Sequence, residues 1–240
     1  MKDQIDSECF VEDSLGPYTL ALQMLCKDTV RGNILAAAKK RFVHYGYAKT
    51  TMAEIASDCN MSPGNLYRYF PGKLDIAEAI CTEAGEYAIA KLRDAMRRPG
   101  RTAKERLRDF LFADMQLTYD QLEFDKQVFE MARVVSSERP QFANRILALN
   151  RALLSEILAA GNASSEFVIE DVVFTAEMLQ SATMKFRYPQ MHSKLSYENL
   201  QRELDGVLHL LLNGLDDGGA GRDKFPKVSR EKESDVLVSI

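Results

Sequence analysis

The densest set of helix start and stop signals in the chain lies in residues 51–73, and its spacing limits the possible fold more than any other feature. Thr51 and Glu54 form a capping-box pattern, in which two side chains pair with the first free N–H groups of a helix. Asn60 follows two turns later, and asparagine tolerates the positive φ that a tight turn between helices requires. The pattern predicts a short helix over 51–58 that ends in a tight turn.

A second short helix is predicted directly after this turn. Ser62 can cap it, and Pro63 suits the first helical position because proline lacks the N–H that would be unpaired there. The Pro-Gly pair at 71–72 stops it, so we place this helix at 62–69. A helix of two turns is not stable alone in water, so we expect neighbouring helices to hold it.

A longer helix is predicted upstream, over residues 28–44. Ile34 and Phe42 fall on one face of it, two turns apart. Asp28 is placed to cap this helix, and Gly46 follows its end, where a residue with positive φ is common. Three helices with a tight turn between the second and third make a helix-turn-helix unit.

The third helix of such a unit enters the DNA major groove, while the second crosses the backbone. Leu66 and Phe70 share one face and are expected to hold the helix down. On the opposite face Asn65 and Arg68 can reach base edges, and Lys73 stands in the first turn of the next helix, where phosphate is attracted. The expected DNA contacts, base and phosphate together, are Thr50, Thr51, Ser62, Pro63, Gly64, Asn65, Tyr67, Arg68, Tyr69 and Lys73.

The charge distribution agrees with a local polyanion contact. The whole chain of 240 residues carries a formal net charge of −4. Residues 28–75 carry seven basic and four acidic side chains, a net charge of +3. A basic segment on an acidic chain favours nucleic-acid contact by that segment alone, although a solvated helix face would have a similar composition.

The remainder of the chain shows helical periodicity nearly throughout, which predicts an all-α fold. One helix is expected to begin after the Pro-Gly pair at 71–72 and to run to residue 98. Further helices are expected at 102–119, 124–137, 140–160, 166–186 and 196–215. The expected domains are an N-terminal extension at 1–27, a helix-turn-helix DNA-binding domain at 28–75, a helical effector-binding and dimerisation domain at 76–215, and a disordered tail at 216–240.

Several functional classes are disfavoured by composition. The four cysteines are scattered without C-x-x-C spacing, which argues against a disulfide framework and a metal site. We find no G-x-S-x-G, phosphate loop, H-E-x-x-H or G-x-G-x-x-G, so we expect no enzymatic activity and no cofactor. The first residues are acidic, unlike a signal peptide, and no apolar run reaches membrane-spanning length, so we expect a cytoplasmic protein with no membrane contact.

The run KTTMAEIASDCNMSPGNLYRYFPGKLDI, with ILAAAKKRFVHYG upstream, resembles the DNA-binding domain of the TetR/AcrR family of transcriptional regulators. The resemblance covers about a fifth of the chain without a gap. Asn60 stands where the family usually has glycine, and Tyr69 stands where many members carry histidine. Both replacements are compatible with the roles of those positions, because asparagine tolerates positive φ and tyrosine can donate to phosphate.

The resemblance implies an all-helical homodimer of about nine helices whose last two helices pair in a four-helix bundle. It also implies a repressor that a small, hydrophobic effector releases from a palindromic operator in double-stranded DNA. Broad apolar stripes in 166–186 and 196–215 are compatible with a dimer face. The alternatives are a helical protein-interaction module and a DNA-binding protein that responds to no ligand.

Large, adaptable side chains in the central helices are candidates for an effector pocket. They are Phe112, Met115, Tyr119, Phe129, Arg133, Phe174 and Met178. Aromatic and methionine side chains at helical spacing are also typical of plain core. Arg133 has two readings, as the polar anchor of a pocket or as a partner in a surface salt bridge.

Overall fold

The computed structural model describes residues 29–124, 126–187 and 195–216, and within these residues it contains ten helices and no strand. The helices are α2 (Val30–Tyr45), α3 (Met52–Asp58), α4 (Pro63–Tyr67), α5 (Lys73–Met96), α6 (Ala103–Phe124), α7 (Lys126–Glu138), α8 (Pro140–Ala163), α9 (Val172–Ala182), α10 (Met184–Arg187) and α12 (Tyr197–Asp216). The expected all-α fold is confirmed. The expected N-terminal extension, and the expected tail apart from Asp216, lie outside the described residues. Among the described helices, none is both long and apolar enough to cross a membrane.

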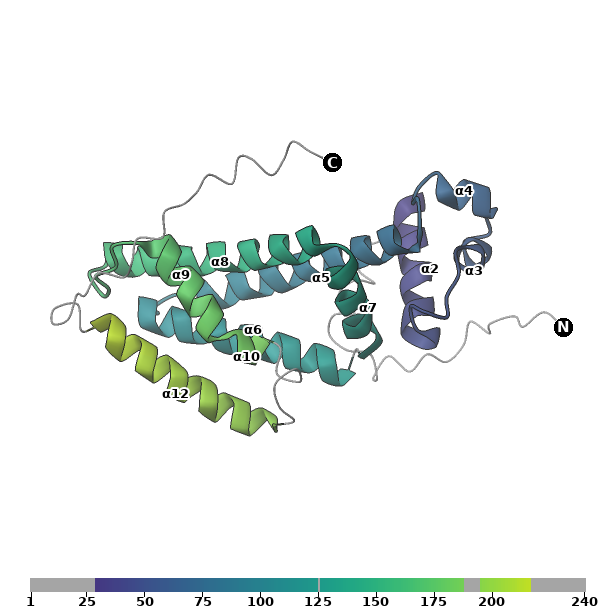
Figure 1. Cartoon of the computed structure of the whole chain (residues 1–240). Coiled ribbons are helices and arrows are strands. Elements are labelled where there is room, and N and C mark those ends of the chain that lie inside the picture. The colour runs from purple at the N-terminus through teal and green to yellow at the C-terminus, as the bar shows by residue number, and fades with distance from the viewer. Residues whose placement is uncertain (1–28, 125, 188–194, 217–240) are drawn as a thin grey trace.

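Helices α2, α3 and α4 lie together at one end of the molecule (Figure 1). Their starts and turns follow the expected local chemistry with one correction. Thr29, not Asp28, caps α2, because its side chain accepts a hydrogen bond of 3.0 Å from the N–H of Gly32. Gly46 ends α2 with φ of 86°, and Asn60 lies between α3 and α4 with φ of 53°, as expected.

Helix α5 carries the chain from this end into the body, where α8 runs beside it (Figure 1). Two apolar cores lie along this axis. The core of the body is formed mainly by α5, α6, α8, α9 and α12. The core at the DNA-binding end combines residues of α2 to α5 with Val128, Met131 and Val135 of α7 and Phe142 of α8. The three-helix unit therefore does not close its own core, and α7 supplies the missing side.

The prediction of one continuous helix over 166–186 is wrong, because the helix begins later and is interrupted. The backbone of Ile169 is bonded on both sides by the Asn162 side chain, at 2.8 and 3.0 Å, which stabilises a loop instead of a helix. In this loop Phe167 packs so closely on Gly161 that a Cβ on that glycine would lie 2.1 Å from the ring. Helix α9 begins only after Asp171, whose side chain caps it. The helix then breaks at Thr183 before the short α10.

Candidate nucleic-acid interface

The turn that precedes α4 is built by local hydrogen bonds. The N–H of Met61 returns to the carbonyl of Ala56 at 3.0 Å, across the positive φ of Asn60. Ser62 then caps α4, because its hydroxyl accepts a hydrogen bond of 3.2 Å from the N–H of Asn65. The sequence therefore fixes both the turn and the first residue of α4 through contacts within five residues.

One face of α4 is anchored in the core. Leu66 is fully buried and Phe70 is 1% exposed, and both belong to the apolar cluster that contains Ile34 and Ile55. Met61 packs against the same cluster from the turn. The expected anchoring of α4 is confirmed. A helix of five residues is too short to be stable alone in water, so the burial of Leu66 and Phe70 stabilises it in addition to its own hydrogen bonds.

The other face of α4 is open to solvent. Tyr67 is 51% exposed, Tyr69 is 37% exposed, and Arg68 is also exposed. Asn65 is half-buried, and a Cβ added to Gly64 would meet no atom within 4 Å. Ser62 and Pro63 complete the exposed face at the start of the helix. Seven of the ten expected DNA contacts are thus brought together on α4 and its flanking residues.

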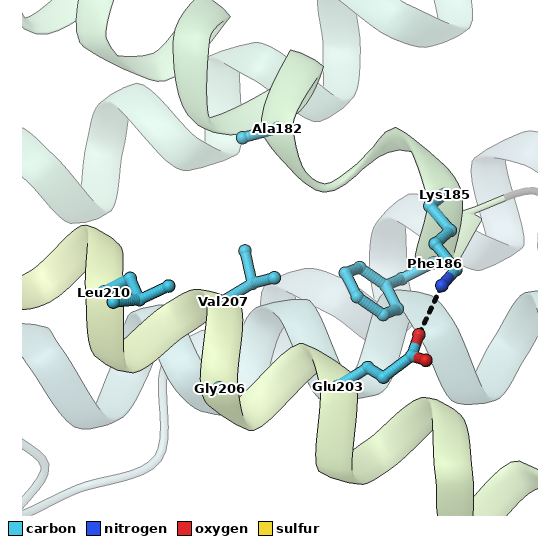
Figure 2. Close-up of a pocket in the computed structure, with 7 residues that line it drawn as sticks. All are labelled: Ala182, Lys185, Phe186, Glu203, Gly206, Val207 and Leu210. Atoms are coloured by element: carbon cyan, nitrogen blue, oxygen red, sulfur yellow. Dashed lines mark hydrogen bonds and ion pairs between the residues drawn. The ribbon is translucent and has the colours of Figure 1, made fainter.

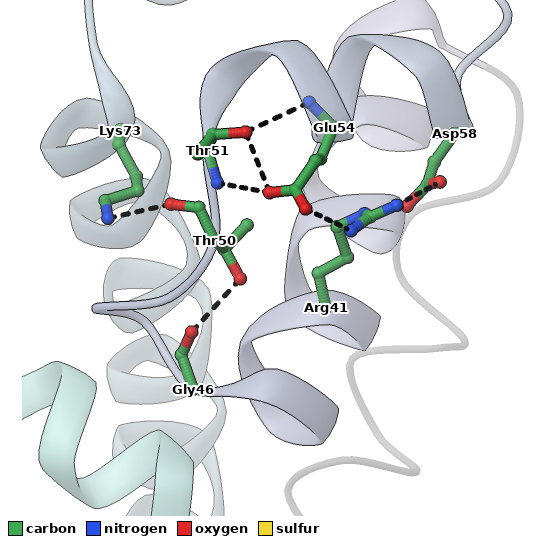
Figure 3. Close-up of polar contacts among 7 residues, drawn as sticks. All are labelled: Arg41, Gly46, Thr50, Thr51, Glu54, Asp58 and Lys73. Atoms are coloured by element: carbon green, nitrogen blue, oxygen red, sulfur yellow. Dashed lines mark hydrogen bonds and ion pairs between the residues drawn. The ribbon is translucent and has the colours of Figure 1, made fainter.

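Thr51 is exposed at the start of α3, beside this face, and it forms the predicted capping box (Figure 3). Its N–H and hydroxyl both donate to Glu54 Oε2, at 2.8 and 2.7 Å, and its Oγ1 accepts from the N–H of Glu54 at 3.3 Å. The hydrogen bond from the Thr51 hydroxyl lowers the pKa of Glu54. Arg41 of α2 pairs with Glu54 and Asp58, which ties α2 to α3.

Two of the expected phosphate contacts do not lie free on this face. Thr50 is only 2% exposed, and its hydroxyl donates to the carbonyl of Gly46 at 3.0 Å. The ammonium of Lys73 donates to the carbonyls of Tyr47 and Thr50, both at 2.8 Å, and of Ala48 at 3.4 Å. An ammonium has three N–H donors, so these carbonyls use all of them. Both side chains serve the loop before α3, because backbone carbonyls there lie within their reach (Figure 3).

The surroundings of Lys73 are consistent with this structural role. Its nitrogen lies 4.4 Å from the ring centroid of Tyr47, on the same loop whose carbonyls it bonds. Burial lowers the pKa of Lys73, while the charge of Glu54 acts in the opposite direction. A lysine held in this way fixes the loop that leads to Thr51 and α3.

Two exposed basic residues of the helix-turn-helix end were not expected as DNA contacts. Arg31 is exposed, donates to the carbonyl of Tyr69 at 3.2 Å, and lies 4.1 Å from the ring centroid of Phe70. Lys49 is exposed on the loop just before Thr51. The only sequence signal for either was its positive charge in a basic segment, and the contact of Arg31 with Tyr69 joins residues 38 positions apart.

The residues expected to line an effector pocket do not share one environment. Met115 is 1% exposed in the body core, whereas Phe174 and Met178 are 37% and 43% exposed on α9. Arg133 is exposed and pairs with Glu130 at 3.0 Å, so it forms the surface salt bridge. The remaining three, Phe112, Tyr119 and Phe129, are half-buried on α6 and α7.

A groove of about 450 Å³ opens between α12 and the segment that contains the end of α9 and α10 (Figure 2). None of the seven expected pocket residues lines it. Lys185 and Glu203 form an ion pair at one end of the groove, and Leu210, which is 72% exposed, lies at the other. The lining residues are Ala182, Lys185, Phe186, Glu203, Gly206, Val207 and Leu210.

A pair of amides is buried between α8 and α9. Asn150 is 2% exposed and Gln180 is 8% exposed. The Gln180 amide nitrogen donates to the carbonyl of Leu147 at 2.9 Å and to the Asn150 oxygen at 3.3 Å. The amide nitrogen of Asn150 has no hydrogen-bond partner within the described part of the chain. A buried donor in this state is uncommon in native proteins.

Comparisons with known proteins agree with the geometry of both parts of the chain. A family model for bacterial regulatory proteins of the tetR family matches residues 34–80. A second model, for a tetracyclin repressor-like C-terminal domain, matches residues 103–208. The first match covers the helix-turn-helix end and the second covers most of the helical body.

Two curated relatives match parts of the chain. The HTH-type transcriptional activator FasR of Mycolicibacterium smegmatis is 32% identical over 107 residues, which cover 45% of this chain and 47% of FasR. The HTH-type transcriptional regulator UidR of Escherichia coli K12 is 36% identical over 64 residues, which cover 27% of this chain and 33% of UidR. The chain thus spans less than half the length of either relative.

Two solved structures share the fold over most of the chain. The fatty acid degradation regulator FadR from Bacillus halodurans has a TM-score of 0.58 at 22% identity, with 79% of this chain and 97% of that chain covered. Salmonella enterica GusR has a TM-score of 0.56 at 25% identity, with coverage of 78% and 95%.

Proposed function

We propose that this chain, which belongs to the TetR family of bacterial transcriptional regulators, acts as a homodimeric repressor that a small molecule releases from a palindromic operator. The observation that carries the DNA-binding part is the construction of α4, whose inner face is buried at Leu66 and Phe70 while its outer face is exposed. Because its target is DNA, we place its action in the cytoplasm.

The proposed interface divides base reading from phosphate contact. The half-buried Asn65 of α4 and the exposed Arg68 directly after it have the side chains that pair with adenine and guanine edges. The hydroxyl groups of Ser62, Tyr67 and Tyr69 lie at the rim and suit phosphate oxygens, as does Thr51 at the start of α3. Pro63 and Gly64 let the backbone come close to the DNA. Arg31, which bonds the carbonyl of Tyr69, and Lys49, on the loop before Thr51, add positive charge and join the proposed phosphate contacts.

The proposed dimer forms through α9 and α12. Both helices expose large apolar side chains: Val173, Phe174 and Met178 on α9, and Leu210 on α12. Gly206 leaves the groove beside Leu210 without a side chain, with open space above it. A second copy related by a two-fold axis would bring an equivalent leucine to this bare stretch, which makes the surface self-complementary.

The buried amide of Asn150 supports an effector site inside the body. A buried amide donor with no partner among the described residues costs free energy, so a bound molecule with a hydrogen-bond acceptor would stabilise it. Its neighbour Gln180 comes from α9, one of the two helices proposed to form the dimer. An effector bound there would therefore touch both the body core and the dimer helices.

Repression is the simpler of the two regulatory outcomes. A repressor needs only to cover the promoter, whereas an activator also needs a surface for the transcription machinery. FasR, the relative described above, is an activator. A reporter gene placed behind the protein's own operator distinguishes the outcomes: deletion of the regulator raises expression if it represses and lowers expression if it activates.

The decisive experiment is selection of bound duplexes from a random-sequence DNA library by the full chain at low salt. We expect enrichment of an inverted repeat whose half-site centres are about 34–36 Å apart, or a multiple of that distance. We also expect affinity to fall steeply as salt increases, because phosphate contacts release counterions. A library that returns no enriched sequence at low salt would reject DNA binding by this chain.

A further inference from the structure

We infer that Arg139 is a positioning residue that sets the angle of the DNA-binding unit, α2 to α4, on the body of the protein. In the dimer this angle decides which spacing between two half-sites the protein accepts. The inference rests on the proposed function, and it names a residue of the body that touches no part of α4.

Arg139 stands between α7 and α8 and reaches across to α5. Its Nη1 donates to Glu78 Oε2 at 3.0 Å, and its Nη2 donates to Asp75 Oδ1 at 2.8 Å. Asp75 and Glu78 are three residues apart, so they lie on the same face of the first two turns of α5. A planar guanidinium that bonds two carboxylates at once fixes direction as well as distance, which a lysine or an apolar contact does not.

We call Arg139, Asp75 and Glu78 the clamp. The end of α5 that carries Asp75 and Glu78 also holds the DNA-binding unit. Lys73, the first residue of α5, bonds the carbonyls of Tyr47 and Thr50 in the loop before α3. Burial raises the pKa of the Tyr47 phenol, and the charges of Glu138, Asp75 and Arg139 also act on it. A continuous set of polar contacts thus runs from the body, through the start of α5, to the residue before Thr51.

Apolar packing holds the DNA-binding unit against the body but does not fix the angle between them. Val128, Met131 and Val135 of α7 share one cluster with Phe42 of α2. Hydrophobic contact is not directional, so these surfaces tolerate small rotations. The clamp side chains are 38%, 28% and 28% exposed for Arg139, Asp75 and Glu78, so the ion pairs contribute little to folding stability. Their removal should change the angle and leave the fold intact.

The test measures binding of the full chain to three duplexes. The first carries the inverted repeat recovered from the random library, and the other two have one base pair added to or removed from its spacer. We expect Arg139→Gln to reduce the preference for the original spacer by roughly 2-fold to 30-fold, the range of coupling that mutations between sites produce. The dependence of affinity on salt should not change, because Arg139 contacts no phosphate.

Two further variants isolate the clamp. Asp75→Asn combined with Glu78→Gln should reproduce the effect, and adding Arg139→Gln to that pair should change nothing more, because all three groups form one unit. Arg145→Gln is the matched control. Arg145 lies on α8 and reaches Thr82 of the same α5 at 3.0 Å, but it takes no part in the clamp. It should leave the spacer preference as in the parent chain.

An unchanged spacer preference in Arg139→Gln would overturn the inference. An equal loss of affinity on all three duplexes would overturn it too, since that result indicates a general loss of folded protein. If the parent chain enriches no DNA at all, the proposed function itself fails and the inference fails with it. The two failures are therefore distinguished by the parent chain.

Discussion

The ammonium of Lys73 lies 2.8 Å from the carbonyl oxygen of Thr50, and this contact bonds the first residue of α5 to the loop that leads into α3. The two residues are 23 positions apart, so their pairing appears only in the folded chain. Both had been expected to touch phosphate from the DNA-binding face. Their contact instead makes them part of the support that holds this face.

Replacement of Lys73 by methionine separates support from phosphate contact. We expect Lys73→Met to weaken DNA binding and to lower stability by about 1–2 kcal/mol, because charged hydrogen bonds to the loop are lost. The slope of log affinity against log salt should stay as in the parent chain. Lys49→Ala is the contrasting variant and should reduce that slope by about 0.9, because the exposed Lys49 is one of the proposed phosphate contacts. An equal reduction of the slope in Lys73→Met would indicate that Lys73 contacts phosphate after all.

Base reading by α4 can be tested at Asn65 and Arg68. We expect Asn65→Ala or Arg68→Ala to cost about 1–3 kcal/mol on the preferred operator and to relax discrimination at one base position. The measurement is affinity for a panel of single-base operator variants. Tyr69→Phe, which removes only a hydroxyl at the rim of the interface, should lower the affinity for all operator variants to the same extent. Unaltered discrimination in both alanine variants would place base reading elsewhere.

Glu166 predicts a pH dependence of stability. Its carboxylate accepts hydrogen bonds from the N–H of Ala103 at 3.0 and 2.9 Å, at the first turn of α6, and these bonds lower the pKa of Glu166 below its usual 4.5. A lowered pKa stabilises the fold above pH 4.5, and this contribution is lost as the pH falls through the lowered value.

The corresponding variant is Glu166→Gln. Its melting temperature should lie below that of the parent chain at pH 7, and the difference should shrink as the pH falls below about 4.5. Glu156→Gln, on an exposed position of α8, should show no such trend. A difference that is constant between pH 7 and pH 3 would contradict the role of the Glu166 charge at the start of α6.

The proposed dimer face can be disrupted at Leu210. This side chain is 72% exposed at the groove, and a charge there would be buried in the dimer at a high cost. We expect Leu210→Asp to shift the full chain from dimer to monomer in analytical ultracentrifugation and to abolish cooperative binding to the inverted repeat. Leu149→Asp is the control, since Leu149 is 40% exposed on α8, outside the groove. If Leu210→Asp remains dimeric, the interface lies on another surface.

The unpaired amide of Asn150 gives a prediction that requires no known effector. Asn150→Leu keeps a similar volume and removes a buried donor that has no partner among the described residues. It also removes the acceptor of the 3.3 Å bond from Gln180, but Gln180 keeps its shorter bond to the Leu147 carbonyl. We expect it to raise the free energy of unfolding by about 1 kcal/mol, measured by urea denaturation. Gln180→Leu should instead lose stability, because it breaks the bond to the Leu147 carbonyl. A large destabilisation by Asn150→Leu would indicate that this amide is satisfied in solution.

Prediction from sequence worked best where structure depends on a few neighbouring residues. The capping box at Thr51, the cap at Ser62 and the positive φ of Asn60 and Gly46 all follow from hydrogen bonds or steric limits within five residues. The cap of α2 and the start of α9 were wrong for the same kind of reason, since Thr29 and the Asn162–Ile169 contacts compete locally with the expected pattern.

The sequence by itself determined that the chain is helical, where most of the helices begin and end, and that α4 has an apolar face at Leu66 and Phe70. Tertiary structure decided what covers each face and where long polar side chains point. The closure of the first core by α7, the inward turn of Lys73, and the ion pair between Arg139 and Glu78 all join residues that are at least 23 positions apart. Apolar periodicity shows that a face will be buried, but it carries no information about its partner, because hydrophobic attraction is not directional.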